Sequence, residues 1–295
     1  METQRFGRLV FIPGQNKGKY PFCNSLFVDD EIRAVIDPAA GQAAMTELAQ
    51  TEKPHIVINS HYHEDHFTWN YLFDEAGLYV HAADAPCFTS LEILLDAYGV
   101  DDPAEIAGWK HILEEEFNFR EKTPSRLLRD GEVLDFGRTR LTVVHTPGHT
   151  PGHCGFYCAE EGVLFTGDLD MTSFGPWYGD RVSDIGDTLS SIDRLLEFPA
   201  EIYVTSHNMG VIRENFAALS RTYRNVIAER EEKITGLMDE PRTVEEIADH
   251  WPIYKKPRQP LVFYQFGERG MVRKHLEYLV AQGRAAVANE RYYLL

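Results

Sequence analysis

The chain has 295 residues, of which 43% are hydrophobic and 25% charged, an ordinary globular composition that can bury a sizeable core. The net charge of −17 arises mainly in residues 1–220 and makes nucleic acid a disfavoured substrate for that part. Four scattered cysteines argue against a disulfide framework, the start lacks a secretory signal pattern and no apolar run reaches bilayer length, so we expect a cytoplasmic protein without a membrane span.

The N-terminal part predicts a sheet with a helix beside it. Apolar runs separated by glycine and proline predict a meander of antiparallel strands at 9–12, 26–28 and 34–38. A helix over 41–51 and a strand over 56–58 follow. Asp37 closes the third strand and has two interpretations of equal weight. Its carboxylate holds a metal-binding histidine from behind, or it caps the 41–51 helix.

The next segment continues the alternation and then interrupts it. A helix near 68–75 and a strand at 78–80 indicate a layered α/β fold. Residues 84–124 then form a helical insertion rich in aromatic residues, with expected helices at 88–98 and 105–117. This insertion is expected to be a lid over a pocket, a dimer contact or an ordinary helical layer on the sheet.

Residue types that bind metals recur where predicted strands end. Four times an apolar strand runs directly into a histidine or an aspartate, at His61, His149, Asp168 and His207. Side chains from several strand ends meet at one edge of a sheet in α/β proteins, and binding sites are built there. One such histidine would be weak evidence, whereas four strand ends together indicate a shared site.

The stretch 61–66 reads His-x-His-x-Asp-His and enlarges the set to five imidazoles and two carboxylates. The candidate metal ligands are His61, His63, Asp65, His66, His149, Asp168 and His207. One tetrahedral ion needs about four ligands, so this set predicts two adjacent divalent ions. Nitrogen and oxygen ligands without thiolate suit zinc, which we prefer, with iron and manganese as alternatives. Asp168 is placed to bridge the ions, and a metal-bound hydroxide would be the nucleophile of a hydrolase.

The chain resembles the metallo-β-lactamase superfamily over about residues 7–215. The resemblance rests on Asp37, the cluster 61–66, Thr-Pro-Gly-His at 146–149, Gly-Asp at 167–168 and Ser-His at 206–207. It implies a four-layer αβ/βα sandwich. By resemblance His61, His63 and His149 would bind the first ion, Asp65, His66 and His207 the second, and Asp168 both. Glyoxalase II-like and lactonase-like hydrolases are the nearer relatives, because true β-lactamases of this fold lack the bridging aspartate.

Three further residues are candidates for substrate contact. Trp177 and Tyr178 lie in the loop after Asp168, and Asn208 follows His207 where the superfamily often has glycine. Tyr178 would donate a hydrogen bond to substrate or, as the stronger interpretation, pack in the wall. His153 matches no role in the family, and we interpret it as a structural residue or one that supports a ligand.

The C-terminal part, residues 214–295, is predicted to be a small, mainly α domain after a catalytic domain over 1–213. A long helix over 211–238, a helix opened by a capping box at Thr243 and a helix over 270–282 precede a hairpin that ends the chain. This order is similar to a winged helix. Few basic residues lie on the last helix, so we expect it to pack on the catalytic domain, shape the pocket rim or mediate a homodimer.

The leading functional hypothesis is a dinuclear metal-dependent hydrolase that acts on a small ester, thioester or lactone, with Asp65 and Asp168 as catalytic carboxylates. The domain order resembles that of mitochondrial endoribonucleases, which makes a single-strand-specific endoribonuclease the alternative. An iron-dependent persulfide dioxygenase with one metal ion and a non-enzymatic regulator that binds DNA through its tail are further alternatives. A small molecule is the expected partner, and nucleic acid is the less favoured one.

Overall fold

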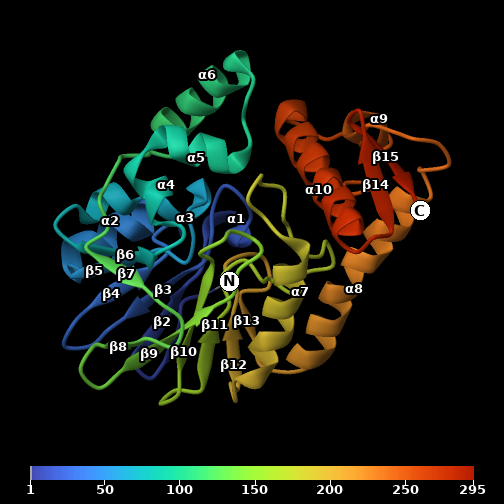
Figure 1. The fold of residues 1–295 in the computed structure, drawn as a ribbon. Coiled ribbons are helices and arrows are strands. Elements are labelled where there is room, and N and C mark those ends of the chain that lie inside the picture. Colours follow the sequence, from blue (N-terminus) through green and yellow to red (C-terminus); the bar gives the residue numbers. More distant parts are fainter. Residues whose placement is uncertain (1) are drawn as a thin grey trace.

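The computed structural model describes residues 2–295 and contains two facing sheets (Figure 1). The first sheet has the order β1 to β7, with strands Gln4–Phe6, Leu9–Ile12, Ser25–Val28, Ala34–Ile36, Ile56–Ile58, Gly77–His81 and Arg126–Leu128. Strands β2 to β4 form the predicted antiparallel meander, β1 extends it by one strand that was not predicted, and β4 to β7 are parallel. The three-residue edge strand β7 was not predicted, because so short a run shows no periodicity.

The second sheet has the order β13-β12-β11-β10-β9-β8. In chain order its strands are Val133–Asp135 (β8), Arg140–His145 (β9), Cys154–Cys158 (β10), Val163–Phe165 (β11), Ile202–Val204 (β12) and Val211–Ile212 (β13). Strand β11 is parallel to β12, and β10 is antiparallel to both β9 and β11. Strands β9, β11 and β12 therefore point the same way, and their carboxyl ends lie at one edge.

The helices cover the outer faces of the sheets. Their bounds are Gln15–Gly18 (α1), Gln42–Thr51 (α2), Glu64–Phe67 (α3), Ala85–Thr89 (α4), Leu91–Tyr98 (α5), Pro103–His111 (α6), Ile185–Arg194 (α7), Phe216–Thr235 (α8), Val244–Ala248 (α9) and Leu261–Ala281 (α10). Short 3-10 turns at Asn70–Phe73 and Leu195–Glu197 and a π-helical turn at Ile112–Glu116 extend three of these segments. Strands β14 (Ala285–Ala288) and β15 (Arg291–Leu294) form the predicted C-terminal hairpin.

Alternating side chains of the strands build the layers. Leu26 and Ile36 of the first sheet and Val143 and Phe156 of the second fill a core between the two sheets. The alternate residues of the strands point away from this core and pack against helices. Those of the first sheet pack against α2 to α6, and those of the second sheet pack against α7 and α8. The predicted αβ/βα sandwich is confirmed, and Figure 1 shows its layers side by side from left to right. Among residues 2–295 no helix is long and apolar enough to cross a membrane.

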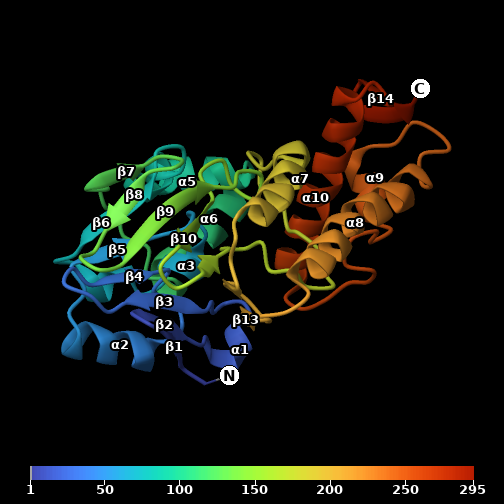
Figure 2. The same ribbon diagram turned by 90° about the horizontal axis from the view of Figure 1, so that it is seen from below.

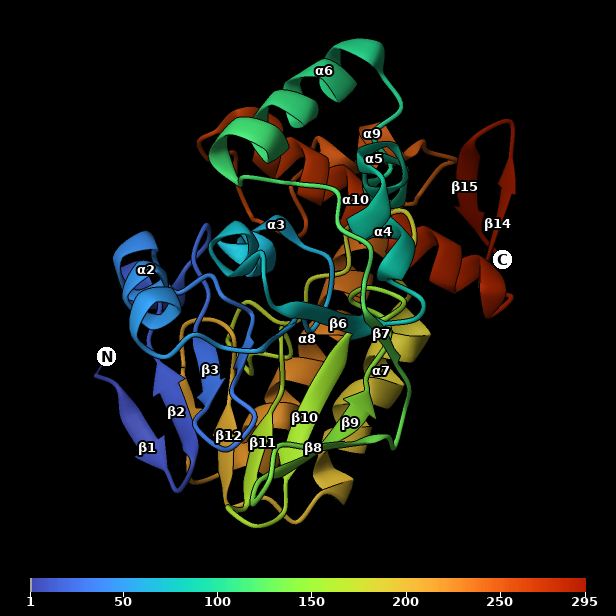
Figure 3. The same ribbon diagram turned by 90° about the vertical axis from the view of Figure 1, so that its left-hand side faces the viewer.

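The helical insertion differs in detail from the prediction. The helix expected over 88–98 is interrupted at Ser90, whose extended backbone ends α4 and whose hydroxyl caps α5 by accepting from the Ile93 amide. Helices α4 and α5 therefore replace the single helix expected over 88–98. The helix expected near 68–75 is a 3-10 turn at Asn70–Phe73. Figure 3 shows α5, α6 and α10 gathered on the same side of the sheets, although they are far apart in sequence.

The C-terminal segment projects beyond the sandwich (Figure 2). Its last helix, α10, begins at Leu261, nine residues earlier than expected, because close packing outweighs the low helix propensity of two glycines. At Gly270 an added Cβ would lie 2.0 Å from the carbonyl oxygen of Gly179, so only glycine lets α10 approach this loop. The boundary at 213/214 and the likeness to a winged helix stay predictions.

Replacing Thr243 by alanine is expected to lower the free energy of unfolding by about 1 kcal/mol. Its hydroxyl accepts from the Glu246 amide while the Glu246 carboxylate accepts from the Thr243 amide, which completes the predicted capping box. Chemical denaturation measures the loss. Thr222→Ala, on the exposed side of α8, is the control and should be close to neutral. Equal losses for both variants would contradict a capping role.

Candidate functional site

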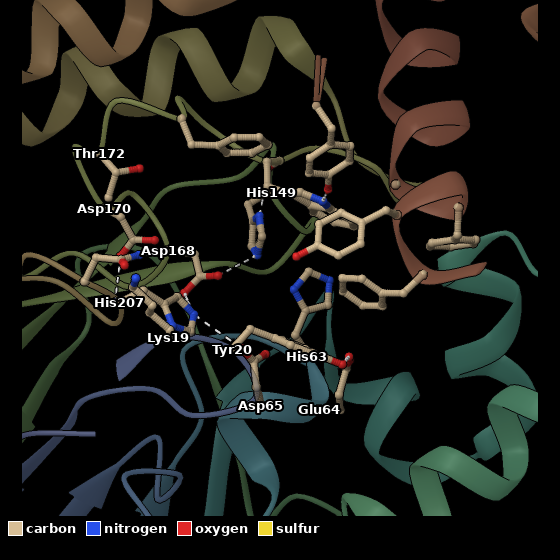
Figure 4. Close-up of a pocket in the computed structure, with 18 of the residues that line it drawn as sticks. Lys19, Tyr20, His63, Glu64, Asp65, His149, Asp168, Asp170, Thr172 and His207 are labelled. Carbon is tan, nitrogen blue, oxygen red and sulfur yellow. Dashed lines mark hydrogen bonds and ion pairs between the residues drawn. The ribbon is translucent and has the colours of Figure 1, made fainter. Parts of the chain in front are cut away.

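The predicted ligands lie together at the edge where β5, β9, β11 and β12 end (Figure 4). The first group is His61, His63, His149 and Asp168, and the second is Asp65, His66 and His207; within each group the ligand atoms lie within 4.8 Å of one another. All seven side chains are nearly or fully buried. The histidine cluster enters helix α3 at Glu64, and α3 ends at Phe67, before the helix expected near 68–75 would start.

Asp168 lies between the two groups. One carboxylate oxygen is 3.3 Å from His149 Nε2, and the other is 3.0 Å from His66 Nε2 and 3.3 Å from His207 Nε2. Asp65 approaches His207 Nε2 to 3.4 Å. The geometry therefore gives Asp168 access to both groups, as the bridging role requires.

The tautomer of His61 follows from a chain of hydrogen bonds. The Ser60 hydroxyl donates its proton to Asp37 Oδ2 at 2.6 Å, so the same hydroxyl accepts from His61 Nδ1 at 2.9 Å. The other nitrogen of His61, Nε2, then carries a lone pair directed into the site. Asp37 Oδ2 also accepts from His66 Nδ1 at 2.9 Å, so a neutral His66 directs the lone pair of its Nε2 into the site.

The remaining three histidines are oriented in the same manner. His149 Nδ1 donates to the Trp177 carbonyl at 2.9 Å, and His207 Nδ1 donates to the Gly18 carbonyl at 2.6 Å. His63 is reversed, because its Nε2 is held by Asp180 at 2.8 Å and its Nδ1 faces the site. A ligating histidine usually donates its other N–H to a carboxylate or carbonyl, which fixes the ring.

The donor set fits divalent cations. His61 Nε2 and His149 Nε2 lie 3.2 Å apart although both carry lone pairs, and such a contact is repulsive unless a cation lies between the nitrogens. Among the described residues, the buried atoms His66 Nε2 and Asp168 Oδ1 have no hydrogen-bond partner. These orphaned acceptors are the atoms that a metal ion would satisfy.

Burial and charge shift the pKa values in opposite directions around the site. Burial opposes the charge of Asp168, but the imidazoles of His207 and His66 outweigh it and hold the pKa of the carboxyl well below its usual range. Burial would lower the pKa of His63, yet Asp180 raises this pKa to about 9. A bound ion must displace the proton from such an imidazole, so metal binding is coupled to proton release.

Two residues that support the ligands resolve open interpretations. Asp37 contacts Ser60 and His66, whereas α2 begins at Gly41 without a side-chain cap, so the supporting interpretation of Asp37 holds. His153 Nε2 accepts from the Asp168 amide at 3.0 Å and thereby fixes the backbone of that residue. Asp180 lies in the loop after Asp168 that was expected to border the pocket, but its contact with His63 was not predicted, because the two residues lie 117 positions apart.

The three candidate substrate contacts differ in their position relative to the cavity. Trp177 and Asn208 line the cavity in front of the ligands, and Asn208 adopts φ +48°, a conformation that asparagine tolerates in place of the usual glycine. The prediction that Tyr178 contacts substrate is not supported, because this side chain is fully buried outside the cavity lining. Its hydroxyl instead contacts Arg230 Nη1 at 3.0 Å and His275 Nε2 at 2.9 Å.

The cavity has a volume of about 470 Å³, within the range of small-molecule sites. Three parts of the chain enclose it: the loops that carry the ligands, the helical insertion through Tyr98 and Trp109, and the C-terminal segment through Tyr254, Phe263 and neighbours. The expectation that the insertion and the tail shape the pocket agrees with this lining. Glu64 accepts hydrogen bonds from the hydroxyls of Tyr20 and Tyr98 and so connects two parts of the cavity lining. This role of Glu64 was not predicted.

Asp37→Asn is expected to weaken metal binding roughly 10- to 100-fold, because an amide orients His66 less well than a carboxylate. Asparagine also tolerates φ +49° at this position, so the backbone should be preserved. Titration against a competing chelator measures the affinity. Asp29→Asn, at a partly exposed carboxylate of the same sheet, is the control, and equal affinities of the two variants would contradict the role of Asp37.

Comparison with known proteins agrees with this geometry. The family model described as "Metallo-beta-lactamase superfamily" matches residues 19–207, which contain all seven ligands. The chain belongs to the metallo-beta-lactamase superfamily. Human acyl-coenzyme A thioesterase MBLAC2 (Homo sapiens) is 29% identical over 152 residues, covering 49% of this chain and 51% of that protein. The chain thus aligns with about half the length of the curated relatives it matches.

Solved structures of the superfamily share the fold. The metallo-beta-lactamase family protein TTHA1429 from Thermus thermophilus has a TM-score of 0.73 and 24% identity, covering 98% of this chain and 99% of that one. This likeness shows the fold and includes the C-terminal segment. TTHA1623, solved in a di-iron-bound form, is 26% identical with a TM-score of 0.51, over 66% of this chain and 92% of its own.

Proposed function

We propose that this protein is a metal-dependent hydrolase that cleaves thioesters of small molecules. The observation that carries the proposal is the convergence of five imidazoles with Asp65 and Asp168 in one cluster, whose His63, His149 and His207 line the cavity together with both carboxylates. Membership of the superfamily supports metal-dependent hydrolysis. The thioesterase relatives support the thioester among the predicted ester, thioester and lactone substrates.

Two divalent ions are the cofactors in this proposal. The first would be held by His61, His63 and His149, the second by Asp65, His66 and His207, with Asp168 shared. Such ions lower the pKa of a water molecule to about 7 and polarise a carbonyl group. Zinc is our preferred metal, and the di-iron form of TTHA1623 supports iron as the alternative.

The residues around the cavity favour water as the nucleophile. In the described part of the chain no serine or cysteine lines the cavity, so the commonest nucleophiles of acyl-enzymes are missing from its wall, and the aliphatic hydroxyl there belongs to Thr172. The carboxylates of Asp65 and Asp168 lie on the cavity wall and would orient the attacking water by accepting its hydrogen bonds. A thiol leaving group with a pKa of about 8.5 departs without strong acid assistance, which a leaving amine would need.

The nucleic-acid alternatives gain no support from the tail. Of the four basic residues of α10, Arg269 pairs with Glu105, Lys274 binds the Arg181 carbonyl and Arg273 is partly exposed. His275 is fully buried. A recognition helix needs these side chains free in a groove, so we do not favour ribonuclease or DNA-binding functions.

The test is metal analysis followed by a substrate panel. We expect about two metal ions per chain and hydrolysis of acyl thioesters that stops when a chelator removes the metal. Lactones, phosphodiesters and single-stranded RNA complete the panel. Cleavage of RNA without thioester hydrolysis would overturn the proposal, and one iron ion with oxygen consumption on a persulfide would favour the dioxygenase.

A further inference from the structure

The cavity is walled by aromatic rings that no part of the metal site requires. One series of rings starts at the ligand His63 and leads away through Tyr98, Trp109 and Phe266, with centroid distances of 5.7, 5.7 and 5.4 Å. All of these residues line the cavity. The distances lie within the 4.5–7 Å that stacked and edge-to-face pairs prefer. This first wall joins the insertion to helix α10.

A second aromatic wall also starts at His63. Trp177 lies 5.4 Å from the His63 ring and donates its indole N–H to the Tyr254 hydroxyl at 3.2 Å. The Tyr254 ring stacks on Phe174 at 5.3 Å with an interplanar angle of 23°. In Figure 4 the reddish helix α10 passes along the cavity on the side of His63. Both series of rings start at His63, and the rings of the first series are tilted by 57–67° to one another, so the cavity is lined by faces and edges of aromatic rings.

The C-terminal part of these walls is held rigidly. The buried Glu268 carboxylate accepts from the amides of Ile253 and Tyr254 at 2.7 and 2.8 Å, which fixes the loop that carries Tyr254. An added Cβ at Gly267 would lie 2.7 Å from the Tyr254 hydroxyl, so the ring rests directly on the helix. Gly270 packs on the backbone of Gly179. The walls are thus preformed rather than assembled around a ligand.

We propose that the acyl group of the substrate is a planar aromatic ring, bound between these two walls with its thioester carbonyl at the metal ligands. This inference rests on the proposed thioesterase function. Preformed aromatic walls favour a rigid ring, because a flexible chain loses more conformational freedom when it is immobilised. Each aromatic contact adds affinity beyond the burial of area. The cavity volume of about 470 Å³ suits a compact group.

The test compares three thioesters of one thiol whose acyl groups have equal numbers of carbon atoms: phenylacetyl, cyclohexylacetyl and octanoyl. The cyclohexyl ring matches the phenyl ring in size but is not flat. We expect kcat/KM for phenylacetyl to exceed both others about tenfold, as one to two aromatic contacts imply. Hydrolysis of the octanoyl or cyclohexylacetyl thioester at an equal or higher rate would overturn the inference while the proposed thioesterase function stands.

Substitutions in α10 test whether the aromatic acyl group binds against this helix. Phe266→Leu keeps an apolar side chain but removes the flat face, and we expect the preference for phenylacetyl to fall below about threefold while octanoyl hydrolysis changes little. Val262→Ala, at an exposed residue of the same helix that does not line the cavity, should leave the preference unchanged. An unchanged preference in Phe266→Leu would contradict the placement of the ring.

A binding measurement separates the two proposals if no thioester is hydrolysed. Calorimetric titration with the free acids phenylacetate, cyclohexylacetate and octanoate reports on the walls without any turnover. Tighter binding of phenylacetate would support the ring site although the thioesterase proposal had failed. Equal or weaker binding of phenylacetate would remove the ring site as well.

Discussion

Asp168→Asn is expected to reduce the metal content from about two ions per chain to one or fewer and to lower kcat/KM roughly a thousandfold, or about 4 kcal/mol. The physical reason is its position, because its two oxygens face ligands of both groups at 3.0 to 3.3 Å. An amide presents one neutral oxygen and one N–H group in place of two negatively charged oxygens. It therefore cannot serve both ions.

Elemental analysis and thioester hydrolysis measure the two effects of this substitution. Asp193→Asn is the matched control, since this carboxylate is exposed and pairs with Arg224 on the protein surface. The control should keep its metal and its activity. Retention of two ions and near-normal turnover in Asp168→Asn would rule out a shared ligand at this position.

Arg230→Met is expected to lower the free energy of unfolding by about 3 kcal/mol, because it leaves buried acceptors unpaired. The guanidinium is 2% exposed and donates to the carbonyls of Phe174 and Pro176, both at 2.5 Å, and to the Tyr178 hydroxyl at 3.0 Å. Methionine fills a similar length but donates no hydrogen bond. Urea denaturation measures the loss.

The same substitution is expected to weaken metal binding, which a purely structural role would leave unchanged. Arg230 of α8 holds the loop 174–178, and the Trp177 carbonyl of that loop orients His149. We expect a reduction of roughly 10-fold, at the lower end of effects on groups behind a metal ligand. Arg221→Met, on the exposed side of α8, should change neither stability nor affinity. Metal affinity equal to that of the unaltered protein would show that the loop does not depend on Arg230.

The predicted ligands could be found because metal chemistry restricts residue type and because the strands that carry them are buried. Apolar runs mark β5, β11 and β12, and alternating apolar residues mark β9; a histidine or an aspartate after each of the four strands indicates one shared site. The distance from His61 to His207 in sequence did not hide that site, since parallel strand ends meet at one edge. In the structure every residue of the predicted ligand set lies in one cluster.

Tyr178 marks the limit of prediction from local pattern. Neighbouring residues in an irregular loop have no periodicity, so the sequence could not tell that Trp177 faces the cavity and Tyr178 the C-terminal core. The backbone carbonyls of Gly18 and Trp177, which orient His207 and His149, carry no residue signal at all. Asp180 carries a suitable residue type, but nothing local separates it from any other loop aspartate.

The sequence by itself therefore indicated a layered α/β fold, a set of candidate ligands and metal-assisted hydrolysis through local patterns, and its resemblance to a known family implied the αβ/βα order of the layers. Tertiary structure alone decided the tautomers of the histidines and the shape of the cavity. The walls combine Trp109 of α6 with Phe266 of α10, and aromatic residues at helical spacing look the same in a sequence whether they pack in a core or line a pocket. Whether these aromatic residues line a pocket or fill a core is decided only by how the insertion and the C-terminal segment pack on the sandwich.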